Sequence, residues 1–131
     1  MNNREKLQCF YDAVIKGDVA AAESVMHPDF TVYEAEGLPY AGIFKGKETW
    51  WKLFARIGTI WTDLKIDSLS LIGEPEGSEF GWYMRMAGKS AKTGKPFEVT
   101  IFERWLLKDG LLYEVRPHYW DTKLLADINT P

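Results

Sequence analysis

Two stretches rich in apolar and aromatic residues, 97–108 and 111–120, are separated only by Asp109-Gly110. An Asp-Gly pair between two such stretches is typical of a type I′ β-hairpin, because both turn positions need a positive φ. The turn predicts a register in which Lys108 pairs with Leu111 and Glu103 with Arg116. Side chains alternate across a strand, so this register decides which residues face the core.

One face of the predicted hairpin is apolar on its first strand except for Glu103. Arg116 lies opposite Glu103, and His118 follows on the same face. A carboxylate in a core-facing row is costly unless it is paired. Two interpretations follow: a structural Glu103–Arg116 ion pair with His118 packed beside it, or a cavity whose polar groups are Glu103, Arg116 and His118.

Pro117 leaves the register of the last strand open. Proline lacks an N–H and often marks a β-bulge. A bulge at Pro117 would turn His118 to the other face and bring Tyr119 and Asp121 inward.

The first half of the chain has helical periodicity. Apolar residues recur with helical spacing over 7–15, a short helix is predicted over 19–26, and a third follows Gly46 and reaches residue 61. Phe30–Glu34 is predicted to be a short strand, and residues 64–72 and 80–86 alternate as strands do. Helices followed by mostly antiparallel strands indicate an α+β fold.

Composition limits the class of protein. A chain of 131 residues suits a single domain, and a net charge of −3 argues against nucleic acid or an anionic membrane as partner. No apolar run is long enough for a membrane span, and the N-terminus lacks the apolar segment of a signal peptide. With one cysteine, Cys9, the expected compartment is the cytoplasm. Aromatic residues are 15% of the chain, which indicates either a very aromatic core or a ring-lined cavity.

The residues that carry chemistry are carboxylates and histidines. His27 and His118 lie far apart and form no metal-binding motif, so no metal is predicted. Cys9 has no base near it in sequence, and no phosphate-binding glycine loop is present, so no cofactor is predicted. General acid–base catalysis in an apolar pocket remains, because such a pocket raises the pKa of a carboxyl group.

Three segments together resemble the nuclear-transport-factor-2-like superfamily, in its SnoaL-like and ketosteroid-isomerase-like branch. They are FYDAVIKGDVAAAESVMHPDFTVYEAEGLPYAG, FKGKETWWKLF and TGKPFEVTIFERWLLKDGLLYEVRPHYWDT. The resemblance covers nearly the whole chain, as one SnoaL-like domain over 1–131. It implies a cone-shaped barrel, in which a curved, mostly antiparallel sheet with three helices packed on one face encloses a deep pocket. Members include isomerases, polyketide cyclases, epoxide hydrolases, dehydratases and non-catalytic binding modules.

The resemblance also implies roles for individual residues. Glu34 matches the place of the ketosteroid isomerase base. Phe10 stands where that family has an oxyanion tyrosine, with Tyr11 adjacent. Glu103 matches the acid of the oxyanion hole, or the acid/base histidine of SnoaL-like cyclases, whose last-strand aspartate corresponds to His118 or Asp121. Neither family's catalytic set is intact.

These arguments predict a cofactor-independent acid–base enzyme acting on an apolar carbonyl- or epoxide-bearing molecule. The predicted catalytic residues are Glu34, Glu103, His118 and Asp121. The predicted substrate-binding residues are Tyr11, Tyr40, Trp50, Phe54, Trp105, Arg116 and Trp120. We expect them to line one pocket of about 300–1,000 Å³.

Three alternatives accompany this prediction. Glu34 is either a pocket base or a solvent-facing charge, and Asp121 is either a site residue or the cap of a C-terminal turn. The protein is alternatively a non-catalytic ligand-binding or dimerisation module, in which Glu103 serves structure only. A carboxylate edge of Glu103 that is free toward an open cavity would favour the enzyme.

The opposite face of the hairpin predicts a homodimer. In the predicted register it carries Phe102, Leu106, Tyr113, Val115 and Tyr119, which is too apolar a set to leave in water. A second copy of the chain is therefore expected to cover it.

Overall fold

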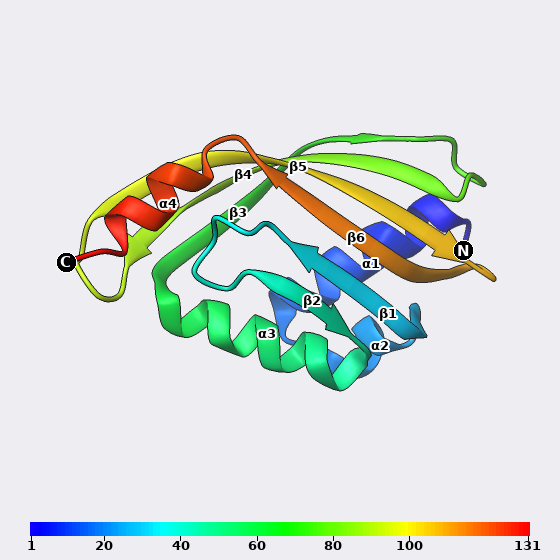
Figure 1. Ribbon diagram of the computed structural model, residues 1–131. Helices are drawn as coiled ribbons and strands as arrows, with labels where there is room; N and C mark the ends of the chain where they lie inside the picture. The colour runs from blue at the N-terminus through cyan, green and yellow to red at the C-terminus, as the bar shows by residue number, and fades with distance from the viewer.

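The computed structural model describes residues 1–131 and confirms the α+β class. Four helices and six strands follow one another along the chain (Figure 1). They are α1 (Asn3–Lys16), α2 (Val19–Glu23), β1 (Met26–Glu34), β2 (Gly42–Lys45), α3 (Lys47–Ile60), β3 (Trp61–Ile72), β4 (Glu79–Ser90), β5 (Pro96–Lys108), β6 (Leu111–Tyr119) and α4 (Thr122–Ile128). None of the helices is both long and apolar enough to cross a membrane.

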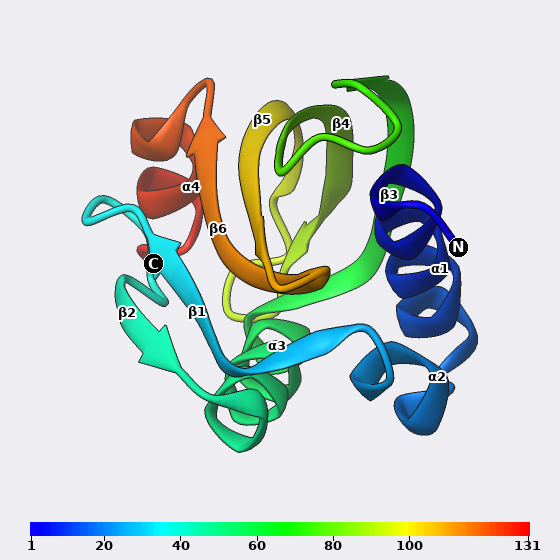
Figure 2. The same cartoon turned by 90° about the vertical axis from the view of Figure 1, so that its right-hand side faces the viewer.

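The six strands form one curved sheet in the order β2-β1-β6-β5-β4-β3. The sheet is not closed, because β2 and β3 remain as edges, so it is an open curved sheet and not a closed barrel. All neighbours are antiparallel except β1 and β6, which are parallel. Figure 2 shows α1, α2 and α3 on the concave side of the sheet, as predicted, and α4 beside β6.

The first helix begins and ends where local chemistry dictates. Asn2 and Glu5 form a capping box, in which each side chain accepts a hydrogen bond from the other's backbone N–H. Gly17 ends the helix with φ 75°, a left-handed conformation that glycine adopts without strain. Leu7 and Phe10 are buried on the face toward the sheet, so this helix covers the concave side.

The β5–β6 hairpin corrects the predicted register. Asp109 and Gly110 have φ of 54° and 70°, and Lys108 pairs with Leu111 as expected. Past the Leu107–Leu112 pair, on the side away from the turn, the register shifts by one residue. Leu106 pairs with Glu114, so Tyr113 is an extra residue on β6. The bulge thus lies at Tyr113 and not at Pro117.

The shift exchanges the two faces of β6. Glu103 now pairs with Pro117, and Arg104 pairs with Arg116. The predicted register would have turned Glu114, Arg116 and His118 toward the core, with the desolvation cost of buried polar and charged groups. The bulge instead turns Val115, Pro117 and Tyr119 inward.

Three further elements differ from the sequence expectations. β2 was not predicted, and β1 begins at Met26, so the second helix is shorter than expected. The C-terminal segment is a helix, α4, whose N-cap Asp121 accepts a hydrogen bond from the backbone N–H of Leu124 at 2.9 Å. Leu125 of α4 is fully buried. The capping alternative for Asp121 is therefore confirmed.

Candidate functional site

A cavity lies between the concave face of the sheet and helices α1 and α3. Its volume is about 170 Å³, below the predicted range, because large aromatic side chains fill much of the space. Ile15 of α1 and Phe54 of α3 line it and are exposed, so the cavity opens to solvent between these two helices. Glu34 and Glu103 are its only charged lining residues.

Aromatic rings hold one another in place around the cavity. The ring of Phe10 forms edge-to-face contacts with Trp50 and Trp105 at centroid distances of 5.3 and 5.5 Å. Trp50 stacks on Phe54 at 5.3 Å, and Tyr11 lies 5.2 Å from Trp82. Such edge-to-face and stacked pairs add stability beyond simple burial, so the wall is preformed.

Glu34 is a buried carboxyl group without a protein partner for one oxygen. It ends the inward row Phe30, Val32, Glu34 on β1, and only 8% of it is exposed. Its Oε1 is buried and makes no hydrogen bond. Burial, and then the charge of Glu103, raise the pKa of Glu34 to about 8. Of the two alternatives for Glu34, the structure shows the residue facing the pocket.

Glu103 lines the same cavity from β5. Its Oε1 accepts a hydrogen bond of 3.2 Å from the indole N–H of Trp105. Burial raises the pKa of Glu103 to about 7, although the bond from Trp105 opposes the rise by stabilising the ionised form. The two carboxyl groups therefore have different environments.

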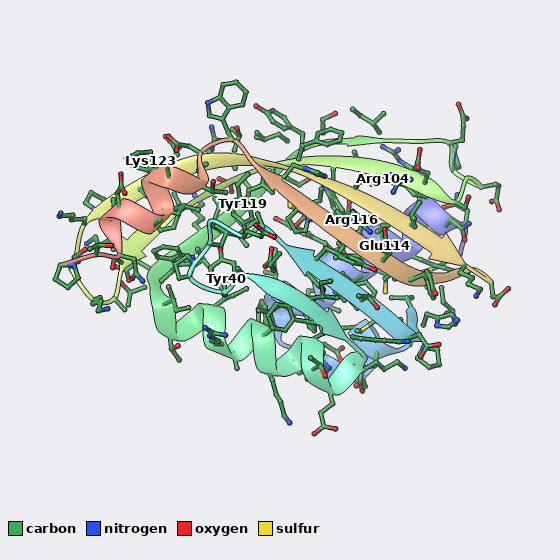
Figure 3. The ribbon with its side chains drawn as sticks, viewed as in Figure 1. Tyr40, Arg104, Glu114, Arg116, Tyr119 and Lys123 are labelled. Atoms are coloured by element: carbon green, nitrogen blue, oxygen red, sulfur yellow. The ribbon has the colours of Figure 1, made fainter.

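Two hydrogen-bonded tyrosine hydroxyl groups lie near the Glu34 and Glu103 carboxyl groups. Tyr119 lines the cavity, and its hydroxyl is 3.0 Å from that of Tyr40. Tyr40, which is fully buried in the loop before β2, also accepts a bond of 3.3 Å from the indole N–H of Trp61. Figure 3 shows Tyr40 and Tyr119 approaching each other from the loop and from the end of β6. Burial raises the pKa of Tyr40 to about 12 and that of Tyr119 well above 10, so both phenols are neutral.

The structure contradicts the predicted pairing of Glu103 with Arg116. The Arg116 guanidinium lies on the outer face, where its Nε donates to Glu114 at 3.0 Å and the group stacks 3.8 Å from the ring of Tyr33 (Figure 3). His118 is exposed on the same outer face. The Tyr113 bulge is the physical reason for both errors.

Trp120 and Asp121 are also outside the cavity. Trp120 is 86% exposed, and Asp121 caps α4. Both follow the end of β6, where the chain has left the concave face of the sheet. Arg116, His118, Trp120 and Asp121 are therefore not part of the site.

The structure brings most of the other predicted residues together. Tyr11, Glu34, Trp50, Phe54, Glu103 and Trp105 line the cavity, and Tyr40 lies behind it. Trp82 also lines the cavity although the sequence did not predict it as a site residue, and Tyr119 was expected to face inward only if β6 carried a bulge. The sequence did contain a sign of the inward position of Tyr119. Leu112 and Val115 are both apolar, but their spacing of three residues would place them on opposite faces of a regular strand, so an extra residue between them was indicated. No three His, Cys, Asp or Glu side chains are grouped to hold a metal ion.

Comparisons with known proteins agree with this architecture. The SnoaL-like domain family matches residues 7–115. An NTF2-like protein from Burkholderia thailandensis has a TM-score of 0.90 at 23% identity, with 100% of this chain and 99% of that chain covered. TerC, crystallised with polyporic acid, has a TM-score of 0.83 at 17% identity, with 98% of each chain covered.

A further solved structure carries a more specific name. A protein from Jannaschia named as a SnoaL-like polyketide cyclase has a TM-score of 0.80 at 16% identity, with 98% of this chain and 92% of that chain covered. No curated protein sequence matches this chain. Structural likeness at these identities shows the shared fold.

Proposed function

Since the chain belongs to the SnoaL-like domain family of the NTF2-like superfamily, we propose that it is a small-molecule enzyme that works by general acid–base catalysis. The substrate class we propose is a neutral, apolar molecule of about one ring that bears a carbonyl group. An apolar cavity of about 150 Å³ is known to take up benzene, and the cavity here has about 170 Å³. TerC supports the assignment by its fold alone, and the Jannaschia protein supports it by its fold and its name.

The observation that carries this proposal is the pair of unequal carboxyl groups in one apolar cavity. The N–H of Trp105 favours the ionised form of Glu103. Glu34 has no donor to its buried oxygen, which favours the protonated form. We therefore assign Glu103 as the general base and Glu34 as the general acid.

These roles give a balanced reaction step. The Glu103 carboxylate removes a proton from the carbon next to the carbonyl. The C–H electron pair forms a C=C bond, and the π pair of the carbonyl moves to its oxygen to form an enolate. The Glu34 carboxyl group donates a hydrogen bond or its proton to that oxygen. While the enolate is bound, the proton on Glu103 exchanges with solvent. Return of a proton or deuteron from Glu103 to the same carbon completes exchange, and its return to another carbon of an unsaturated substrate completes isomerisation. The carbonyl forms again in that step, and Glu34 recovers any proton that it gave to the oxygen, so both carboxyl groups are regenerated.

Uptake of solvent deuterium tests the proposal without assuming a particular product. Cyclohexanone in D₂O is expected to gain deuterium next to its carbonyl faster with the protein than without it, as followed by NMR. The rate should rise as pH passes about 7, where Glu103 ionises, and fall above about 8, where Glu34 loses its proton. Because the two carboxyl groups interact, the rising and falling limbs of the pH–rate profile report apparent pKa values of the pair and not of either residue alone. A rate equal to buffer across pH 6–9 would remove the acid–base assignment.

The alternative function is a non-catalytic binding module. It would be favoured if the oxygens of Glu103 were used by Arg116 and by the backbone. Instead, Arg116 binds Glu114 and Glu103 accepts one hydrogen bond, from Trp105. This arrangement supports the enzyme.

A homodimer through the outer sheet face remains part of the proposal. Val115 and Tyr119 point inward, contrary to the prediction, but Phe102 and Tyr83 of this face are 41% and 40% exposed. We expect light scattering at micromolar concentration to give twice the 15.1 kDa chain mass. Phe102→Lys should give the monomer, whereas Ile43→Lys at the β2 edge should not. A wild-type monomer would show that the face stays uncovered.

The proposed compartment is the cytoplasm. The single cysteine, Cys9, is unpaired and partly buried. A chain with one cysteine can form no internal disulfide, which suits a reducing compartment.

A further inference from the structure

Most N–H and O–H donors of the cavity are used within the protein, and only the indole N–H of Trp50 has no acceptor there. Three lining donors are already used within the protein: Tyr11 donates to the carbonyl of Ile66 at 2.8 Å, Trp82 to Ser68 at 2.7 Å, and Trp105 to Glu103 at 3.2 Å. The two carboxyl groups receive one protein hydrogen bond between them. No lysine, arginine or histidine lines the cavity.

Glu34 is the acceptor that has no donor within the protein. Its Oε1 is buried and unpartnered inside a cavity that opens to solvent between α1 and α3. A buried polar atom without a partner destabilises the folded protein. The complementary partner is a ligand group that brings N–H donors.

From this geometry we propose that the cavity also binds single-ring organic ammonium ions, which compete there with the carbonyl substrate. The ammonium group lies against Glu34 and Glu103, and the ring lies among Trp50, Trp82 and Trp105. The inference rests on the proposed function only in so far as the two ligands share one cavity.

Two physical effects favour the cation. Its positive charge relieves the repulsion between two carboxylates held in an apolar environment. Trp50 and Trp82 also line the cavity, and an indole attracts a cation that lies over its face within about 6 Å of its centre. An anionic ligand meets the opposite situation, because its carboxylate adds a further negative charge beside Glu34 and Glu103 without any basic side chain to offset it.

Ammonium binding must displace protons from the pair. The titratable groups that face it are Glu34 on β1, Glu103 on β5, Tyr11 on α1 and Tyr119 on β6, with Tyr40 behind Tyr119. The tyrosines stay neutral, since burial raises the pKa of each. The carboxyl groups hold protons near pH 7. Affinity for an ammonium ion therefore increases as pH rises toward 8.5, whereas a neutral ligand releases no proton.

Three probes of similar size and different charge test the proposal: benzylamine, benzyl alcohol and benzoate. Binding is followed by tryptophan fluorescence and by calorimetry in two buffers of different ionisation enthalpy, at pH 6, 7.5 and 8.5. Benzylamine should bind about tenfold or more tightly than benzyl alcohol at pH 7.5 and release up to one proton, and benzoate should not bind. Glu34→Gln and Glu103→Gln should each weaken benzylamine binding about ten- to hundredfold. Glu98→Gln, on the outer face of β5, should not.

Clear results would overturn the proposal. Benzoate binding as tightly as benzylamine, equal affinities for benzylamine and benzyl alcohol, or benzylamine binding without proton release would each do so. Unchanged benzylamine binding by both correctly folded cavity variants would do the same.

The cyclohexanone assay separates this inference from the proposed function. Deuterium uptake without selective benzylamine binding removes the ammonium site and leaves the enzyme. Selective benzylamine binding without deuterium uptake removes the enzyme and leaves the ammonium site. If both are present, benzylamine should inhibit deuterium uptake competitively.

Discussion

Replacement of Glu103 by glutamine is expected to slow deuterium incorporation into cyclohexanone by about 10²–10⁴-fold, the usual contribution of a general base. Glutamine keeps the length of the side chain and an oxygen that can accept the N–H of Trp105. It cannot take up the proton from carbon. The change therefore removes the base while leaving the shape of the cavity and its aromatic wall.

The same variant separates catalysis from stability. Burial disfavours the ionised form of Glu103, and glutamine cannot ionise. The free energy of unfolding of the variant at pH 8 should therefore equal or exceed that of the wild type. Glu98→Gln is the matched control, since Glu98 lies on the same strand but faces solvent, and it should retain the wild-type rate. If Glu103→Gln exchanges deuterium at the wild-type rate, Glu103 is not the base.

The free energy of unfolding is expected to decrease as pH rises from about 5 to 9. Glu34 has an ordinary pKa of 4.5 and a folded pKa of about 8, and Glu103 titrates at about 7 when folded. Because both folded values are raised, the folded state binds more protons than the unfolded chain between these limits. The stabilisation is complete below pH 4.5 and is lost as pH passes through about 7 and 8. For Glu34 alone the loss is on the order of 4 kcal/mol.

Urea unfolding of the wild type and of Glu34→Gln at pH 5, 7 and 9 measures this effect. Glutamine resembles the neutral acid, so the variant should match the wild type at pH 5 and exceed it by a few kcal/mol at pH 9. Glu98→Gln should keep the wild-type slope. Wild-type stability that is flat or increases over this range would mean that Glu34 is ionised in the folded protein near neutral pH.

Local sequence patterns determined much of the hairpin and of the carboxyl pair. Asp109-Gly110 specified the turn and the Lys108–Leu111 pairing, since few dipeptides adopt positive φ twice in succession. Period-two alternation placed Ile101, Glu103 and Trp105 on the inner face of β5. Both are short-range effects, which depend only on neighbouring residues.

The position of Glu34 in the cavity needed more than alternation. The pattern of β1 put it in line with Phe30 and Val32. Its raised pKa, however, comes from burial and from Glu103, which is distant in sequence. Two acids become a coupled pair only when the sheet curves and brings them to one cavity.

The tertiary structure decided where the register of β6 shifts and in which order the strands lie. The bulge at Tyr113 reflects a balance between one irregular backbone site and the burial of Glu114, Arg116 and His118. The parallel β1–β6 contact joins segments separated by α3 and four strands. Turn chemistry and periodicity say which face a residue prefers, but the free energy of packing the whole sheet selects where the register shifts and which strands meet.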